Sequence, residues 1–174
     1  ISNFKQTSNK PKNVIRKKIN IGFVGVICPS KGIHRALEAI LKTKYADKVI
    51  INLVGRVENK YFKKYLLSNF GNLDLSFKGY LNNENLIKEM QSFDLLLMPS
   101  PSEGLPLSCI NAINYEIPIL FTKQSGLSTF LGDVGEYDYY NEDELVELIE
   151  KISLEKLLKA QKMFAGFTQF FYLS

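Results

Sequence analysis

The feature that most constrains the fold is a regular alternation between two kinds of apolar segment. Short strand-like runs, most of them apolar throughout, alternate with longer segments whose apolar residues recur at helical spacing. Strands that are apolar on both sides and separated by single helices indicate a parallel sheet covered on both faces. The sequence therefore predicts an α/β fold: a Rossmann-like, doubly wound parallel sheet of about six strands with helices on both faces.

The same alternation predicts where each element lies. Strands are expected at residues 19–27, 49–54, 73–77, 94–98, 117–121 and 134–137. Helices are expected at residues 31–44, 60–70, 83–93, 106–115 and 142–152. In the second helix, the spacing predicts that Tyr61, Tyr65 and Leu66 share one apolar face. Ligands of such sheets bind at the carboxyl ends of the strands, so a site is expected in the loops that follow them.

The basic residues are concentrated at the start of the chain. Residues 1–18 hold six Lys and Arg residues and no Asp or Glu, and this polar segment is interpreted as a linker. Residues 19–174 are interpreted as one domain of ordinary size. The net charge of +4 comes from the linker rather than from a face of the fold, so no nucleic-acid partner is expected.

Few residues suit disulfide or metal chemistry. Two cysteines and one histidine make neither a disulfide framework nor a zinc site, which suits a reducing cytoplasm. No apolar run approaches the ~20 residues of a membrane span, and the N-terminus has no signal-peptide pattern. Because the chain does not begin with Met, we expect a piece of a longer protein. His34 is expected to be a surface or capping residue, and Cys109 a core residue.

The loop after the first strand is a candidate anion site. It runs from Gly25 to Gly32 into a helix N-terminus, where free backbone N–H groups can hold an anion, and Lys31 adds a positive charge. The P-loop order of Gly-Lys-Ser/Thr and the dinucleotide fingerprint are both absent from it. After the second strand, Arg56 places another cation at the same edge. If each feature is considered alone, there is a simpler alternative. The loop could be an ordinary turn with a solvated lysine, and Arg56 could be a surface arginine.

The loop after the fourth strand, residues 99–107, combines a carboxylate with a helix start. Two prolines stiffen its first half, Gly104 permits close backbone approach, and Pro106 opens the next helix. Glu103 can accept hydrogen bonds from hydroxyl groups while the helix N–H groups hold an anion. The alternative is that Glu103 only caps the helix and satisfies its dipole. Together the loops suit a ligand that carries both phosphates and hydroxyls.

Several short motifs follow one another in an order that is specific, although each is weak alone. They are Phe23-Val24-Gly25 with Lys31-Gly32, Leu53-Val54-Gly55, Phe77-Lys78-Gly79-Tyr80, Phe93-Asp94 with Pro99-Ser100, Glu103-Gly104, Ile117-Pro118-Ile119-Leu120 and Ser125-Gly126-Leu127. In this order and spacing, residues 19–152 resemble the C-terminal, nucleotide-sugar-binding lobe of a GT-B-fold glycosyltransferase of the retaining group 1 family.

The resemblance implies a function. The chain would be the donor-binding lobe of a glycosyltransferase that moves a sugar from a nucleoside diphosphate to an acceptor, with retention, in glycan or polysaccharide biosynthesis. Such enzymes need no bound metal, and this chain has no Asp-x-Asp motif. The N-terminal acceptor lobe of the parent would be absent here, so the isolated lobe is expected to be inactive. The resemblance places the parent in the cytoplasm and leaves open a peripheral contact of the missing lobe with the inner membrane face.

The resemblance also implies roles for individual residues. Lys31 would neutralise the donor diphosphate, and Glu103 would bind hydroxyls of the transferred sugar. Backbone N–H groups around Gly104 and Leu105 would approach the sugar and phosphate at the helix that Pro106 opens. The base pocket would be lined by Gly79, Tyr80 and Leu81.

Three departures from the family pattern matter for function, one of them Thr129, which stands where the family's Gly-Gly turn leads to an acid. Val26 stands where the family has Arg, a loss for which Arg56 is a candidate compensation. Asn111 stands where the family has a second Glu; it can still bind ribose hydroxyls if Ile110 and Ile113 face the sheet. The departures sustain an alternative: a degenerate GT-B-like lobe that binds a nucleotide sugar or serves as a scaffold without catalysis.

Overall fold

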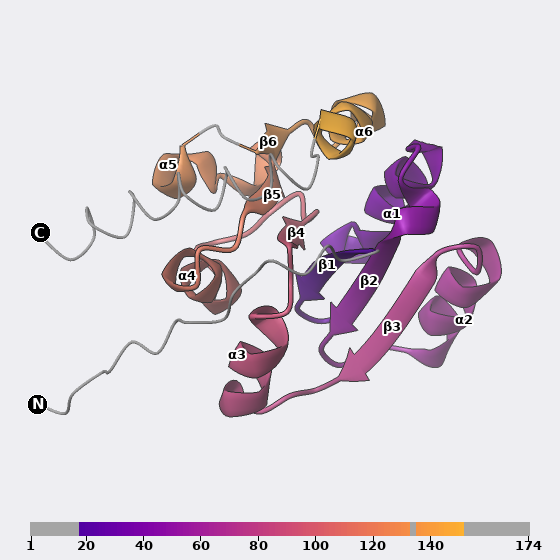
Figure 1. Cartoon of the computed structure of the whole chain (residues 1–174), viewed down its shortest axis with the longest axis horizontal. Coiled ribbons are helices and arrows are strands. Elements are labelled where there is room, and N and C mark those ends of the chain that lie inside the picture. Colours follow the sequence, from indigo (N-terminus) through magenta and orange to yellow (C-terminus); the bar gives the residue numbers. More distant parts are fainter. Residues whose placement is uncertain (1–17, 133–134, 152–174) are drawn as a thin grey trace, which may run out of the picture.

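The computed structural model describes residues 18–132 and 135–151, which form a six-stranded parallel sheet (Figure 1). The strands lie in the order β3-β2-β1-β4-β5-β6, and every neighbouring pair is parallel. The predicted Rossmann-like, doubly wound fold is therefore confirmed. The strands are β1 (Ile19–Val24), β2 (Val49–Val54), β3 (Asp74–Gly79), β4 (Leu95–Met98), β5 (Ile119–Thr122) and β6 (Glu136–Tyr137).

The strand order reverses between β1 and β4. The chain builds one half of the sheet outward from β1 to β3, then returns and builds the other half from β4 to β6. The loops that leave β1 and β4 therefore diverge at the middle of the sheet. In doubly wound folds, this switch point is the expected place for a ligand.

Helices cover both faces of the sheet (Figure 1). One apolar cluster joins the sheet to α1, α2 and α6, and a second joins it to α3, α4 and α5. The second cluster is built around large buried residues of the central strands, including Leu96 and Phe121. The helices are α1 (Ile33–Lys42), α2 (Lys60–Asn69), α3 (Asn83–Met90), α4 (Leu107–Asn114), α5 (Ser128–Leu131) and α6 (Glu142–Lys151).

Several predicted boundaries were wrong at the ends near the ligand edge. The first strand ends at Val24, because the chain leaves the sheet after Gly25, and only a single bridge pairs Ile27 with Val57. The first helix starts at Ile33, after a short 3-10 turn, η1 (Pro29–Lys31). Two further 3-10 turns, η2 (Ala46–Lys48) and η3 (Lys123–Ser125), and the short α5 were not predicted.

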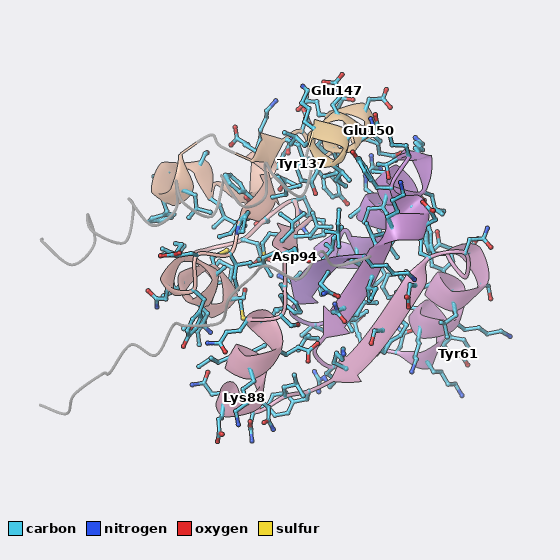
Figure 2. The ribbon with its side chains drawn as sticks, viewed as in Figure 1. Tyr61, Lys88, Asp94, Tyr137, Glu147 and Glu150 are labelled. Atoms are coloured by element: carbon cyan, nitrogen blue, oxygen red, sulfur yellow. The ribbon has the colours of Figure 1, made fainter. Side chains whose placement is uncertain are left out.

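The predicted apolar face of α2 was right for Leu66 and wrong for Tyr61 and Tyr65, which are exposed. The buried residues are Phe62 and Leu66, which lie four residues apart on one line of the helix. Tyr61 is 73% exposed and lies on the outer side of α2 (Figure 2). The helix contacts the sheet through one narrow stripe, so residues about 100° away from that stripe face solvent.

Three predictions fall on segments outside the described residues. The first is the basic linker, of which only Lys18 is described. The others are the start of the sixth strand at residue 134 and the end of the domain beyond residue 151. Lys18 belongs to the folded part, since its Nζ lies 2.9 Å from a carboxylate oxygen of Asp74 on β3. Within residues 18–132 and 135–151, no helix is long and apolar enough to cross a membrane.

Candidate functional site

Backbone hydrogen bonds tie together the loops that follow β1, β2 and β3. Gly25 N donates to Val54 O at 2.9 Å, and Gly55 N donates to Gly79 O at 2.8 Å. Gly55 has a φ of 136°, and a Cβ there would collide with the Gly25 carbonyl oxygen. Only glycine permits this close approach, so the three loops form one continuous backbone surface at the carboxyl edge.

A cavity of about 900 Å³ opens beside these loops. Its lining includes five of the residues proposed from sequence: Gly25, Arg56, Gly79, Tyr80 and Leu81. The structure thus brings together residues from the ends of three strands, as expected for ligand-binding loops. The Tyr80 side chain is 82% exposed at the rim, which leaves its ring free to cover a ligand.

Sequence reasoning missed several residues of this cavity. Lys63 and Phe77 both line it, with the Lys63 ammonium 4.8 Å from the centre of the Phe77 ring. Lys78 also lines it, and its Nζ pairs with Glu89 on α3 at 3.1 Å. Lys63 lies in the first half of α2 rather than in a loop. An inspection of the loops alone therefore did not detect it.

The two residues proposed for catalysis contact each other across the switch point. Lys31 Nζ donates a hydrogen bond to Glu103 Oε1 at 2.6 Å, joining the loop after β1 to the loop after β4. The two side chains are 31% and 14% exposed, so the pair is partly shielded from water. Gly32, with a φ of 70°, packs against the Pro99 carbonyl so closely that a Cβ there would collide with it. These contacts fix the positions of a cation and a carboxylate at the centre of the edge.

Buried hydroxyl groups hold the Glu103 loop in place. The Thr122 hydroxyl, at the end of β5, donates to the Ser100 carbonyl oxygen. The Ser100 hydroxyl in turn donates to the Ser102 carbonyl oxygen at 2.9 Å. Both side chains are almost completely buried. Sequence reasoning missed Thr122, although a hydroxyl residue directly after an apolar run was the available signal.

The start of α4 differs from the expectation. Pro106 is the N-cap and not the first helical residue, and within the described residues no side-chain cap hydrogen bond is made there. The Glu103 carboxylate bonds to Lys31 instead, which contradicts the alternative of a simple helix cap. Gly104 has open space where a side chain would be, and Leu105 packs against the second apolar cluster. Gly104, Leu105 and Pro106 do not line the 900 Å³ cavity.

Asn111 occupies a half-buried position on α4 outside that cavity. Its Nδ2 atom is buried and has no hydrogen-bond partner among the residues that the structure describes. The expectation that Ile110 faces the sheet was wrong, because Ile110 is 39% exposed, whereas Ile113 packs partly against the core. The small residues Ser108, Cys109 and Ala112 are the buried ones, which lets α4 lie close to the sheet.

Neither His34 nor Cys109 has the surroundings of a catalytic group. His34 is half-buried against the Phe62 ring rather than on the surface, and burial lowers the pKa of its imidazole. Cys109 is a buried core residue, as predicted. Burial, and secondarily the charge of Glu103, raises the pKa of its thiol to about 12. Within the described residues, no group of three His, Cys, Asp or Glu side chains could hold a metal ion.

The high thiol pKa leads to a direct prediction. Iodoacetamide at pH 8 should leave Cys109 unmodified in the folded chain, because alkylation requires an accessible thiolate. In concentrated urea, Cys109 should react like an ordinary thiol. Mass spectrometry of peptides from both samples measures this difference. Rapid modification of Cys109 in the folded chain would contradict its assignment as an inert core residue.

Fold and loops together define a doubly wound α/β domain with a candidate ligand site at the switch point of its sheet. Residues 5–166 match the family described as Glycosyl transferases group 1, and the chain belongs to this family. The resemblance of the sequence motifs to the group 1 glycosyltransferase family is thereby confirmed.

Similar proteins have been described in bacteria. The chain is 26% identical over 165 residues to the capsular polysaccharide biosynthesis glycosyltransferase CapH of Staphylococcus aureus. The aligned region covers 90% of this chain and 44% of CapH. It is 31% identical over 116 residues to the 2-deoxystreptamine glucosyltransferase of Streptomyces kanamyceticus, covering 66% of this chain and 30% of that protein. The chain thus spans 30% to 44% of the length of the curated relatives it matches.

Solved structures with the same fold include GT-B enzymes. The catalytic domain of the cholesterol-α-glucosyltransferase of Helicobacter pylori superposes with a TM-score of 0.75 at 21% identity, covering 87% of this chain and 95% of that one. Anabaena HepE, crystallised in complex with UDP, superposes with a TM-score of 0.72 at 17% identity. The superposition covers 86% of this chain and 44% of HepE. At these identities the likeness concerns the fold, which agrees with the predicted GT-B lobe.

Proposed function

We propose that this chain is the nucleotide-sugar-binding lobe of a retaining, metal-independent glycosyltransferase. The parent enzyme would move a sugar from a nucleoside diphosphate to an acceptor held by a further, N-terminal lobe. One observation carries the proposal: Lys31 and Glu103 are held 2.6 Å apart at the switch point, and the loop from Gly25 connects Lys31 to a 900 Å³ cavity. A cation and a carboxylate placed in this way suit the phosphates and hydroxyls of one ligand.

The geometry suggests how the donor would be bound. The donor diphosphate would replace Glu103 as the partner of Lys31, and the freed carboxylate would accept hydrogen bonds from sugar hydroxyls. When the bond between the anomeric carbon and the diphosphate oxygen breaks, the electron pair stays with the diphosphate. Lys31, Arg56 and the uncapped N–H groups at the start of α4 would stabilise that negative charge. Such stabilisation takes the part that a metal ion plays in other transferases, and no cofactor is proposed.

The remaining site residues have supporting roles in the proposal. Val26 is exposed and uncharged at the cavity rim, so Arg56, which lines the same cavity, would supply the second cation. The sugar and phosphate would approach the backbone N–H groups of Gly104 and Leu105, next to the Pro106 cap. The base would lie against Gly79, Tyr80 and Leu81, and the ribose near Asn111.

The biological setting of the proposal comes from the relatives. One of them is named as a capsular polysaccharide biosynthesis glycosyltransferase, and one structural neighbour was crystallised with UDP. We therefore place the parent in bacterial-type polysaccharide or glycan biosynthesis. It would act in the cytoplasm, and contact with the inner face of the membrane would be made through its other lobe.

The test of this proposal is binding, because half of the catalytic site lies outside the chain. UDP, GDP and ADP are titrated against the ¹⁵N-labelled chain, and at least one should bind with a dissociation constant of about 0.1–1 mM. Resonances of residues 25–32, 79–81 and 103–107 should shift. If millimolar amounts of all three nucleotides leave these resonances unchanged, the donor-lobe proposal is wrong. The isolated chain should show no sustained transfer or hydrolysis of a donor sugar.

A second candidate function is a degenerate lobe that binds the nucleotide sugar or acts as a scaffold. Two observations favour it: Val26 removes one cation, and Asn111 is an uncharged residue where the family has Glu. Both readings predict nucleotide binding by this chain, so they separate only in the full-length protein. Transfer by the purified full-length protein would exclude the scaffold function.

Asn111 provides a prediction on ribose recognition. Asn111→Glu should strengthen nucleotide binding by about 1 kcal/mol, because a carboxylate accepts charge-assisted bonds from ribose hydroxyls. The 2′-deoxy nucleotide should gain less, since it offers one hydroxyl fewer. Calorimetric titration of both ligands measures the difference. A variant that folds normally and binds both ligands with unchanged affinity would show that Asn111 does not face the ribose.

A further inference from the structure

The 900 Å³ cavity offers a ligand backbone carbonyls rather than carboxylates as hydrogen-bond acceptors. Three backbone carbonyls at its edge already accept bonds from neighbouring loops: Val54 O from Gly25 N, Arg56 O from Ile27 N and Gly79 O from Gly55 N. Among the described residues, no Asp or Glu side chain lines it. The nearby Glu89 carboxylate is paired with Lys78 at 3.1 Å. A ligand group that donates a hydrogen bond therefore finds no carboxylate among the described lining residues, and at these three carbonyls it competes with a bond already made.

Donors and apolar walls are plentiful in the same cavity. Arg56, Lys63 and Lys78 all line it. Arg56 is exposed and, within the part of the chain that the structure describes, forms no ion pair. Valine and leucine side chains supply much of the remaining wall. The cavity therefore suits a flat, weakly polar group whose edge carries acceptor atoms.

Among the nucleobases, uracil matches this pattern best. Its edge carries two carbonyl oxygens and a single ring N–H, whereas guanine presents a ring N–H and an amino group, and adenine and cytosine each present an amino group. A buried donor without an acceptor is costly, and sites discriminate strongly against ligands that leave polar groups unpaired. We infer that this cavity selects uracil, so that the donor is a UDP-sugar. The inference rests on the proposed function and adds the identity of the base to it.

Comparison of nucleotides on the same chain tests the inference. UDP should bind at least about tenfold more tightly than GDP and ADP, as expected for at least one unpaired donor in the purine complexes. Inorganic pyrophosphate, which lacks a base, should bind more weakly than UDP. Equal affinity for UDP and GDP, or for UDP and pyrophosphate, would overturn the selection of uracil while leaving a donor lobe in place. Binding of none of these ligands would instead contradict the proposed function itself.

A gain-of-acceptor variant sharpens the test. Tyr80→Glu adds a carboxylate at a rim position that is 82% exposed, where the change should not disturb folding. The new charge repels the phosphates of every nucleotide alike, so the informative quantity is the ratio of the UDP and GDP affinities. This ratio should fall about tenfold, because the carboxylate accepts from the guanine edge. An unchanged ratio would contradict the placement of the base against residue 80.

Tyr61→Glu is the matched control. Tyr61 is 73% exposed on α2 and does not line the cavity, as its outward position in Figure 2 illustrates. The substitution makes the same chemical change and alters the net charge equally. It should leave the ratio of UDP to GDP affinity as it is in the unmodified chain. A fall in the ratio with Tyr61→Glu as well would show that the effect does not need a carboxylate at the cavity, and would overturn the inference.

Discussion

Lys31→Ala is expected to weaken UDP binding by about 1–3 kcal/mol, the range for hydrogen bonds to charged groups. The structure holds Lys31 at the switch point in direct contact with the Glu103 carboxylate. Its removal takes away the charge that would neutralise the diphosphate. It also leaves Glu103, whose side chain is only 14% exposed, unpaired and close to the incoming phosphates. Isothermal calorimetry with the purified variant measures the loss.

Three controls separate this effect from damage to the fold. Uridine has no phosphate, so its affinity should not change in Lys31→Ala. Lys64→Ala removes an exposed lysine of α2 and should leave UDP binding unchanged. Adding Glu103→Gln to Lys31→Ala should recover part of the loss, because the unpaired carboxylate is then gone. Equal losses for UDP and uridine would mean that the variant is misfolded, and unaltered UDP binding would remove Lys31 from the site.

The fold could be predicted because buried parallel strands have a simple signature. Residues 49–54 are apolar almost throughout, and the structure places β2 at those residues. The errors arose where tertiary contacts override local pattern. On α2, aromatic residues occupy both the buried and the exposed sides, so the pattern alone could not distinguish Phe62 from Tyr61. On α4, the small residues Ser108 and Ala112 are buried against the sheet. A prediction based on hydrophobicity therefore placed Ile110 against the sheet, which was wrong.

The site could be predicted in part for a similar reason. Loops that follow parallel strands must meet at one edge, so Lys31 and Glu103 were expected near each other although 72 positions separate them. Their direct contact required the three-dimensional structure, because it depends on the packing of Gly32 against Pro99. Lys63 was missed because helical position alone does not reveal which side chains reach over a neighbouring strand.

Gly55→Ala is expected to lower the free energy of unfolding by about 3 kcal/mol. The φ of 136° at this position lies in a region that L-residues rarely adopt, and such strain costs about 1–3 kcal/mol. A Cβ would also collide with the Gly25 carbonyl oxygen, so the backbones after β1 and β2 must separate. Their separation breaks the hydrogen bonds of Gly25 N to Val54 O and of Ile27 N to Arg56 O. Urea unfolding followed by circular dichroism measures the change in stability.

Gly126→Ala is the matched control for this variant, because it isolates the cost of the backbone conformation. Gly126 has a φ of 73°, and a Cβ there would meet no atom within 4 Å, so the change should cost only about 1–2 kcal/mol. The variants should also differ in ligand binding. Gly55→Ala opens the backbone surface that lines the cavity and should weaken UDP binding at concentrations where the chain is still folded, whereas Gly126→Ala should not. Equal destabilisation by both variants would show that the loops yield to a Cβ at position 55, and that their close approach is not needed to hold the cavity together.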